Sequence, residues 1–189
     1  MQVAVTVARK LITNASEALS DSSTGWSPSP VDVPIGDYGT AYFVRTLVAT
    51  EGFGANRAEF AVYQSTAIDD NGNPLSGEGG AVYSITFDAG ELPPVEGFWS
   101  ITVYDAEGYL TANSINRFAV GSNSNLVTND SGATVLKLTN ACDAADACDD
   151  GANWLPVPAS PFSLTLRLYG PSEAILTDTW TPPRPRLQS

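Results

Sequence analysis

Hydrophobic residues near the start of the chain recur at the spacing of an amphipathic helix. They stand four residues apart, at Val3, Val7, Leu11, Ala15 and Leu19. We therefore expect a helix over residues 3–19. Residues 21–36 are rich in Pro, Ser and Gly and are typical of a connection, which Trp26 would anchor to the rest of the protein.

A second helix is expected from Asp37 to about Glu51. Asp37 is a suitable N-cap, because its carboxylate can accept hydrogen bonds from the first free amides of a helix. Gly52 and Gly54 would end the helix. The face expected to be buried carries Tyr42, Arg45, Leu47 and Ala49.

From residue 58 onward, apolar and polar residues alternate in short runs, as they do in half-buried strands. The chain has 16 Gly and 13 Pro, and many of them separate these runs. The second predicted strand is expected to return from the first as a hairpin, and the residues after Trp180 read as an extended tail. The predicted strands are 58–65, 81–87, 97–105, 109–112, 117–122, 133–139 and 162–170.

The last predicted strand alternates most regularly. Phe162, Leu164, Leu166 and Leu168 would face one side of a sheet, and the other side would carry Ser163, Thr165, Arg167 and Tyr169. Strands of this kind with irregular connections predict a mainly β protein, an antiparallel β-sandwich of jelly-roll type. The second helix would pack on a sheet. We divide the chain into a helix and connector, 1–24, and a sandwich domain, 25–189.

The composition of the chain disfavours or excludes several kinds of partner, catalytic site and metal site. The formal net charge is −12, which disfavours nucleic-acid and anionic-membrane partners and favours solubility. The chain contains no histidine, so triads with an imidazole base and the usual zinc and non-haem iron sites are excluded. No segment is apolar over the length of a membrane span, and the N-terminus does not resemble a signal peptide.

The two cysteines, Cys142 and Cys148, are close in sequence. A short-loop disulfide is the expected state, with two free thiols as the alternative. A disulfide would favour a periplasmic or secreted location, and free thiols would favour the cytoplasm. A thiolate metal site is less favoured, because two thiolates without histidine make a poor ligand set.

Several charged residues stand among apolar ones. Arg45, Glu59, Asp105, Arg117 and Arg167 must each pair or reach solvent, because burying an unpaired charge is costly. One interpretation is a network of Arg–carboxylate pairs that joins a helix to a sheet. The other is an anion- or sugar-binding site lined by arginine and aromatic residues.

Paired carboxylates could catalyse hydrolysis without histidine. Glu59 and Asp105 are the candidate pair for a glycosidase-like reaction, which needs carboxyl groups about 5–10 Å apart. Trp99 and Tyr104 are candidate sugar platforms. Trp154 could stack on a ligand from a loop surface, although buried packing is the more economical explanation for the tryptophans.

Two segments resemble calcium loops weakly. Residues 69–77 begin with acidic and amide side chains at alternate positions, but Pro74 replaces the glycine that such a loop needs. A hairpin connection is the preferred interpretation. Asp143, Asp146 and Asp149 could also hold Ca²⁺, but a solvated acidic loop is preferred and we expect no cofactor.

Residues along most of the chain resemble one known family. The most specific runs are Phe98, Trp99, Ser100, Thr102, Tyr104 and Asp105, followed by Asn153, Trp154, Leu155 and Pro156. Supporting residues are Gly39, Tyr42, Arg45, Asn56, Glu59, Tyr63, Leu75, Gly77, Tyr83, Leu92, Pro94, Asn116, Arg117, Pro161, Phe162, Arg167, Pro171, Trp180 and Pro183.

From about Gly25 to the end, the chain therefore resembles the domain of unknown function 1214. The resemblance implies a β-sandwich and no established activity. In that family the domain usually follows another one, of unknown function 1254, which this sequence lacks. Residues 142–151 look like an insertion peculiar to this chain.

Two hypotheses of function follow. The preferred one is a non-catalytic binding or assembly module that acts alone, as a homo-oligomer or with a protein partner. The alternative is a histidine-independent hydrolase acting on a glycan or other polar substrate through Glu59 and Asp105, with Arg45 and Arg117 as clamps. The hydrolase requires these four side chains to converge in one open pocket.

Overall fold

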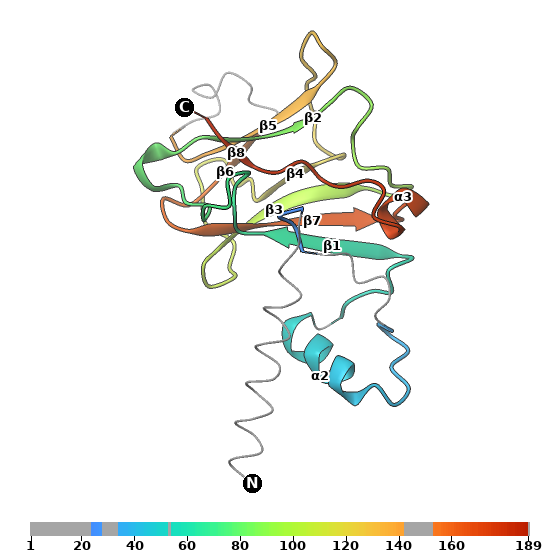
Figure 1. Ribbon diagram of the computed structural model, residues 1–189. Coiled ribbons are helices and arrows are strands. Elements are labelled where there is room, and N and C mark those ends of the chain that lie inside the picture. Colours follow the sequence, from blue (N-terminus) through green and yellow to red (C-terminus); the bar gives the residue numbers. More distant parts are fainter. Residues whose placement is uncertain (1–23, 28–33, 53, 142–152, 189) are drawn as a thin grey trace.

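Two four-stranded sheets form the framework of the described part of the chain, which in this computed structural model is residues 24–27, 34–52, 54–141 and 153–188 (Figure 1). The first sheet has the order β1 (Ala61–Thr66), β7 (Phe162–Tyr169), β3 (Trp99–Asp105) and β4 (Ala119–Gly121). The second has the order β6 (Trp154–Pro156), β5 (Thr134–Thr139), β2 (Tyr83–Phe87) and β8 (Arg186–Leu187). The expected mainly β sandwich is confirmed, and the narrower jelly-roll assignment stays a prediction.

The hydrophobic core lies between the two sheets. Strand β7 alternates buried and half-buried residues along its whole length, as its sequence predicts. Phe87 of the second sheet packs against Trp99 of the first, with ring centroids 5.3 Å apart. Tyr83 meets Phe162 edge to face at 5.9 Å. Each such side chain contributes roughly 1.5–3 kcal/mol by leaving water.

Strand pairing differs from the expected hairpin. Strand β1 pairs with β7, with Ala61 opposite Tyr169, while β2 pairs with β5 and β8 in the other sheet. The hairpin prediction is therefore wrong, because the connection after β1 crosses to the opposite sheet. Strand β6 also runs parallel to β5, so the second sheet is mixed rather than purely antiparallel.

Three short segments also depart from expectation. Residues 109–112 form no strand, and Tyr109 and Leu110 are exposed there. Strands β6 and β8 are present where the sequence predicts a loop and a tail. Both are three residues long or less and lie among prolines, so they form only because β5 and β2 supply their hydrogen-bonding partners.

The second helix, α2 (Tyr42–Glu51), begins later than expected and stands apart from the sandwich. Asp37 is not its N-cap, because Ala41 precedes the first turn and no side chain caps it. None of its described side chains is buried, and Tyr42 is 69% exposed, so the expected packing on the sheet is wrong. Figure 1 shows α2 outside the sandwich, beyond β1. The helix expected over residues 3–19 lies outside the described residues.

The remaining elements are short. A 3₁₀ turn, η1, spans Glu78–Gly80, and the helix α3 spans Glu173–Leu176. Trp26 is fully buried in the core and its Nε1 donates to the carbonyl of Pro183 at 3.2 Å. The expected anchoring role of Trp26 is therefore confirmed.

Candidate functional site

The outer face of the first sheet gathers tyrosines around an arginine. Its four defining residues, Tyr63 of β1, Tyr104 of β3, and Arg167 and Tyr169 of β7, are called here the tyrosine face. The period of two along each strand turns them away from the core, and all four are half-buried. The register fixes their neighbours, because Arg167 stands opposite Tyr63 on one side and Ser100 on the other.

The aromatic half of this face is tied together by stacking and hydrogen bonds. The Tyr63 and Tyr169 rings meet edge to face with centroids 6.0 Å apart, and the hydroxyl of Tyr63 donates to that of Tyr169 at 3.4 Å. Asn56 donates to the Tyr63 hydroxyl from Nδ2 at 2.9 Å. Phe98, which is 38% exposed, stacks on Tyr169 with centroids 4.3 Å apart. These contacts hold the rings in fixed positions at the surface.

Arg167 is held by neutral groups. Its Nη1 donates to Thr102 Oγ1 at 2.7 Å, and its Nη2 donates to the Tyr104 hydroxyl at 2.5 Å. The guanidinium carbon lies 5.6 Å from the centroid of the Tyr104 ring, a cation–π distance. Within residues 24–27, 34–52, 54–141 and 153–188, no carboxylate lies within salt-bridge distance of Arg167.

The tyrosine face has a distinctive electrostatic character. The pKa of Tyr169 lies above its ordinary value of 10.0, first because of the hydrogen bond from Tyr63 and then because of burial. The positive charge of Arg167 opposes this shift and lowers the pKa. The outward positions of the four strands hold no acidic residue, although the chain has 21. The face is therefore an aromatic and hydroxyl surface with one positive charge.

A shallow hollow adjoins this face at the edge of β3 and β4. It encloses about 180 Å³ and is lined by Phe98 and Ser100 among others. Ser100 lies directly opposite Arg167 in the register. The hollow thus extends the aromatic surface towards β4.

The predicted carboxylate pair is not brought together. Ala61, two residues after Glu59, pairs with Tyr169, whereas Asp105 pairs with Phe162 at the other end of β7. Seven residues along a strand span about 23 Å at roughly 3.3 Å each. A glycosidase pair needs about 5–10 Å, so Glu59 and Asp105 cannot act on one bond.

Each of these carboxylates has a local role instead. Glu59 forms an exposed ion pair with Arg57 at 3.1 Å. Asp105 Oδ1 accepts the backbone amides of Glu107 at 3.0 Å and Tyr109 at 2.8 Å, which stabilises the turn after β3. Neither contact points to catalysis.

The two candidate clamps are separated as well. Arg45 is exposed on α2, outside the sandwich. Arg117 is half-buried and donates from Nη1 to the backbone carbonyl of Trp154 at 2.8 Å, which joins the segment before β4 to β6. The expected convergence of Arg45 and Arg117 with the two carboxylates is therefore wrong.

The three aromatic residues expected to stack on a ligand lie in different environments. Trp99 is 3% exposed and faces the core, so it cannot stack on a ligand. Trp154 is 1% exposed in β6, where its Nε1 donates to the Thr139 carbonyl at 2.9 Å, and the loop-surface expectation is wrong. Tyr104 alone lies on an outward face, beside Arg167.

The candidate metal and thiol residues lie outside the described part of the chain. These are Asp143, Asp146, Asp149, Cys142 and Cys148, and the disulfide stays a prediction. Within the described residues, no group of three or more His, Cys, Asp or Glu side chains could hold a metal ion. The described helices also include none that is long and apolar enough to cross a membrane.

The loop that resembles a calcium site is a structural turn. Asp69 is 1% exposed, and its Oδ1 accepts the backbone amides of Asn71 at 2.9 Å and Asn73 at 2.8 Å. Burial raises the pKa of this carboxyl, but the hydrogen bonds from Asn73, Asn71 and Gly72 outweigh burial and hold the pKa below 3.8. The Ile68–Pro74 bridge closes this loop locally, although the hairpin expected between β1 and β2 does not form.

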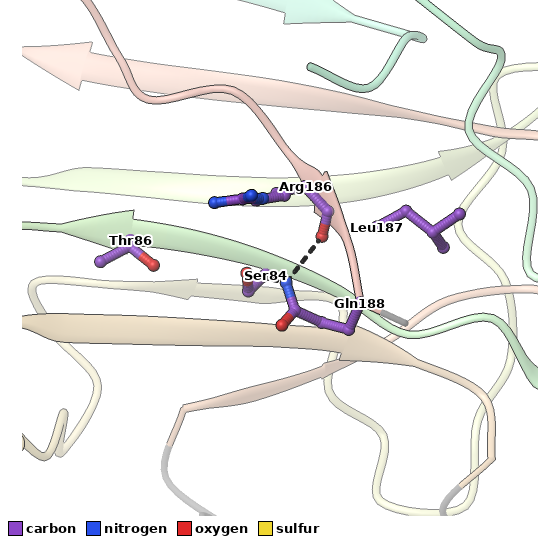
Figure 2. Close-up of a pocket in the computed structure, with 5 residues that line it drawn as sticks. All are labelled: Ser84, Thr86, Arg186, Leu187 and Gln188. Carbon is purple, nitrogen blue, oxygen red and sulfur yellow. Dashed lines mark hydrogen bonds between the residues drawn. The ribbon is translucent and has the colours of Figure 1, made fainter. Parts of the chain in front are cut away.

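A larger depression lies on the second sheet, over β2 and β8 (Figure 2). It measures about 410 Å³, but its polar groups bond to one another. Gln188 Nε2 donates to Ser84 Oγ at 2.7 Å and to the Arg186 carbonyl at 3.2 Å, and Arg186 pairs with Asp70 at 3.6 Å. We therefore favour the tyrosine face, where a charge lacks an acidic partner among the described residues, as the candidate site.

Sequence reasoning named Arg167 only among the charges that could pair or line an anion site, and did not group it with the tyrosines. The signal was present in the alternation of β7, which places an arginine among serine, threonine and tyrosine on the side away from the leucines. Tyr63, Phe98 and Tyr169 could not be grouped with it, because their proximity depends on which strands pair. A charged residue on the polar side of an alternating strand is thus a better indicator of a binding site than a charged residue among apolar neighbours.

Fold and site together define a β-sandwich domain with an aromatic outer sheet face. The chain belongs to the family described as "Protein of unknown function (DUF1214)", whose model matches residues 60–173. Among curated proteins, none matches the chain.

A solved structure shares the fold. The chain is similar to the VPA0106 protein from Vibrio parahaemolyticus, with a TM-score of 0.65 and 26% sequence identity. The match covers 78% of this chain and 35% of that one. This chain therefore corresponds to about a third of its structural neighbour.

Proposed function

We propose that the domain is a non-catalytic module that docks against a second folded protein domain through the tyrosine face. The observation that carries this proposal is the gathering of Tyr63, Tyr104, Tyr169 and Arg167 on an outward sheet face that has no acidic residue. Tyrosine and arginine are enriched in the energetically dominant parts of protein interfaces. Rings held in place before binding also lose little conformational entropy.

An exposed apolar side chain borders this face. Phe98 is 38% exposed and stacks on Tyr169. Exposed aromatic residues that lie together are typical of surfaces that bind a partner. The rest of the chain is acidic, so contacts with an acidic partner are favourable only where a basic group such as Arg167 stands.

The length of the structural neighbour supports a domain as the occupant. The match covers only 35% of that chain, so most of it lies outside the match and could supply the docked surface. The family resemblance likewise implies a neighbouring domain in longer chains.

The hydrolase alternative has no comparable support. Its carboxylates, Glu59 and Asp105, lie at opposite ends of β7 and each stabilises its own local contact. No other observation favours a glycan as the substrate. The geometry therefore favours docking over catalysis.

Superposition on the crystal structure of the Vibrio parahaemolyticus protein tests the docking proposal directly. The sheet face equivalent to the tyrosine face should be covered there by residues outside the matched region. A face that is open to solvent in that protein would contradict the proposal.

Sedimentation velocity of this chain separates a second copy from a different partner. A monomer over the micromolar range is expected. A concentration-dependent dimer that Phe98→Ser abolishes and Tyr109→Ser leaves intact would overturn the proposal in favour of self-assembly. Tyr109 is a matched control, because it is 72% exposed at the turn after β3.

A further inference from the structure

The charge of Arg167 is incompletely balanced. A half-buried guanidinium loses part of its hydration, and a negative partner normally compensates for that loss. Its two hydrogen-bond acceptors, Thr102 Oγ1 and the Tyr104 hydroxyl, are neutral. They satisfy two N–H donors but do not neutralise the charge.

The guanidinium is nevertheless well positioned to bind. It has five N–H donors, and two hydrogen bonds leave three donors that reach no other described residue. Thr102 and Tyr104 hold the two terminal nitrogens, and the Tyr104 ring stacks near the charge at 5.6 Å. A planar donor group that is already oriented can bind a planar acceptor with two parallel bonds.

Two other described arginines have an acidic partner, which Arg167 lacks within the described part of the chain. Arg57 pairs with Glu59 at 3.1 Å, and Arg186 pairs with Asp70 at 3.6 Å. Arg167 has no such partner among the described residues, although the chain is strongly acidic. An internal acid next to Arg167 would occupy the donors that remain open.

We infer that Arg167, oriented by Thr102 and Tyr104, is a receptor for a single carboxylate of the bound polypeptide, an Asp or Glu side chain. This inference rests on the proposed docking function for the source of the carboxylate. One guanidinium matches one negative charge, and the net charge of −12 repels a doubly charged phosphate more strongly. The aromatic rings of Tyr63, Tyr169 and Phe98 then contact the apolar surface around the acid.

Titration of the intact chain with acetate, followed by NMR of the Arg167 Nε–H signal, tests the receptor without any partner. Sodium chloride at equal ionic strength is the control for screening. We expect a saturable shift with acetate in the millimolar range, and a weaker effect of inorganic phosphate. A blocked peptide with one Glu should give the same shift, whereas the matched Gln peptide should not.

Variants assign the shift to the guanidinium. Arg167→Gln should lower the acetate affinity by about tenfold or more, read from the amides of Ser100 and Thr102. Arg167→Lys keeps the charge but lacks the planar fork, and should lose most of the affinity as well. Arg186→Gln is the control and should bind acetate as the wild type does, because Arg186 lies on the other sheet.

The outcomes distinguish this inference from the docking proposal. No saturable shift, an unchanged shift in Arg167→Gln, or tighter binding of phosphate than of acetate would overturn the carboxylate receptor while leaving docking intact. A clear acetate site, together with a solvent-exposed equivalent face in the structural neighbour, would instead contradict the docking proposal. Binding of free acetate but not of the Glu peptide would show that Arg167 binds small carboxylates and not a polypeptide side chain. A dispersed spectrum of each variant confirms that it folds.

Discussion

Arg167 and Tyr104 belong to neighbouring strands, and the guanidinium of one donates to the hydroxyl of the other while lying 5.6 Å from its ring centroid. Each residue therefore orients the other. The pair links the fold to the candidate site, because β7 and β3 must be adjacent for the contact to exist.

Tyr104→Phe should weaken both stability and carboxylate binding. The change removes one hydrogen bond from a charged donor, so we expect the free energy of unfolding to fall by about 1–2 kcal/mol. Acetate affinity should fall because Nη2 is no longer held. Guanidinium chloride denaturation measures the first effect, with Tyr109→Phe as the control at an exposed position. Equal stability of the two variants would contradict the role given to Tyr104.

Asp69→Asn should destabilise the loop between β1 and β2. The buried carboxylate accepts amides of Asn71 and Asn73, and the amide of asparagine is a weaker acceptor. A loss of about 1–3 kcal/mol is expected. Asp70→Asn is the matched control and should change little, because its ion pair with Arg186 is 3.6 Å long and the arginine is 74% exposed.

The same carboxyl predicts an acid dependence. The pKa of Asp69 is lower in the folded protein than its ordinary value of 3.8. Its contribution to stability is therefore complete above that value and is lost as the pH falls through the folded pKa. Denaturation curves between neutral pH and the acid limb should show a smaller acid loss for Asp69→Asn than for the wild type. Parallel curves would argue against this role.

Tyr169 should ionise above pH 10.0 in the folded protein. Tyr63→Phe removes the largest cause of the raised pKa and should lower it, whereas Arg167→Gln removes a positive charge and should raise it further. Because the folded pKa is raised, the contribution of Tyr169 to stability is present below pH 10.0 and is lost as the pH rises through the folded value. Ultraviolet absorbance titration follows the ionisation, and shifts of the opposite signs would refute the arrangement.

Gly121→Ala should separate β4 from β3. A Cβ at this position would overlap the Trp99 carbonyl oxygen and lie 2.7 Å from the Ser100 Cα, and backbone atoms cannot move aside easily. We expect a destabilisation of about 1–3 kcal/mol and faster amide exchange at Val120. Gly52→Ala is the control, because its nearest neighbour would be 3.8 Å away. Equal melting temperatures would show that β4 adapts.

Several features of the candidate site could be predicted from the sequence and others could not. The alternation of residues 162–169 is enough to place Arg167 and Tyr169 on one side of a strand. It cannot place Tyr63 or Phe98 beside them, because residues far apart in sequence meet only through strand pairing. Glu59 and Asp105 were paired as candidates because each is a charge near the end of a predicted strand. The structure places Glu59 near one end of β7 and Asp105 at the other end.

Local sequence determined most of the longer strands, the alternation of their side chains, and the exclusion of chemistry that requires histidine. These properties depend on neighbours a few residues away or on composition alone. Only the tertiary structure decided that β1 pairs with β7 and not with β2, that Trp154 is buried, and that Arg167 meets hydroxyls rather than carboxylates. Strand partners are chosen by the packing of the whole core, which no local pattern encodes.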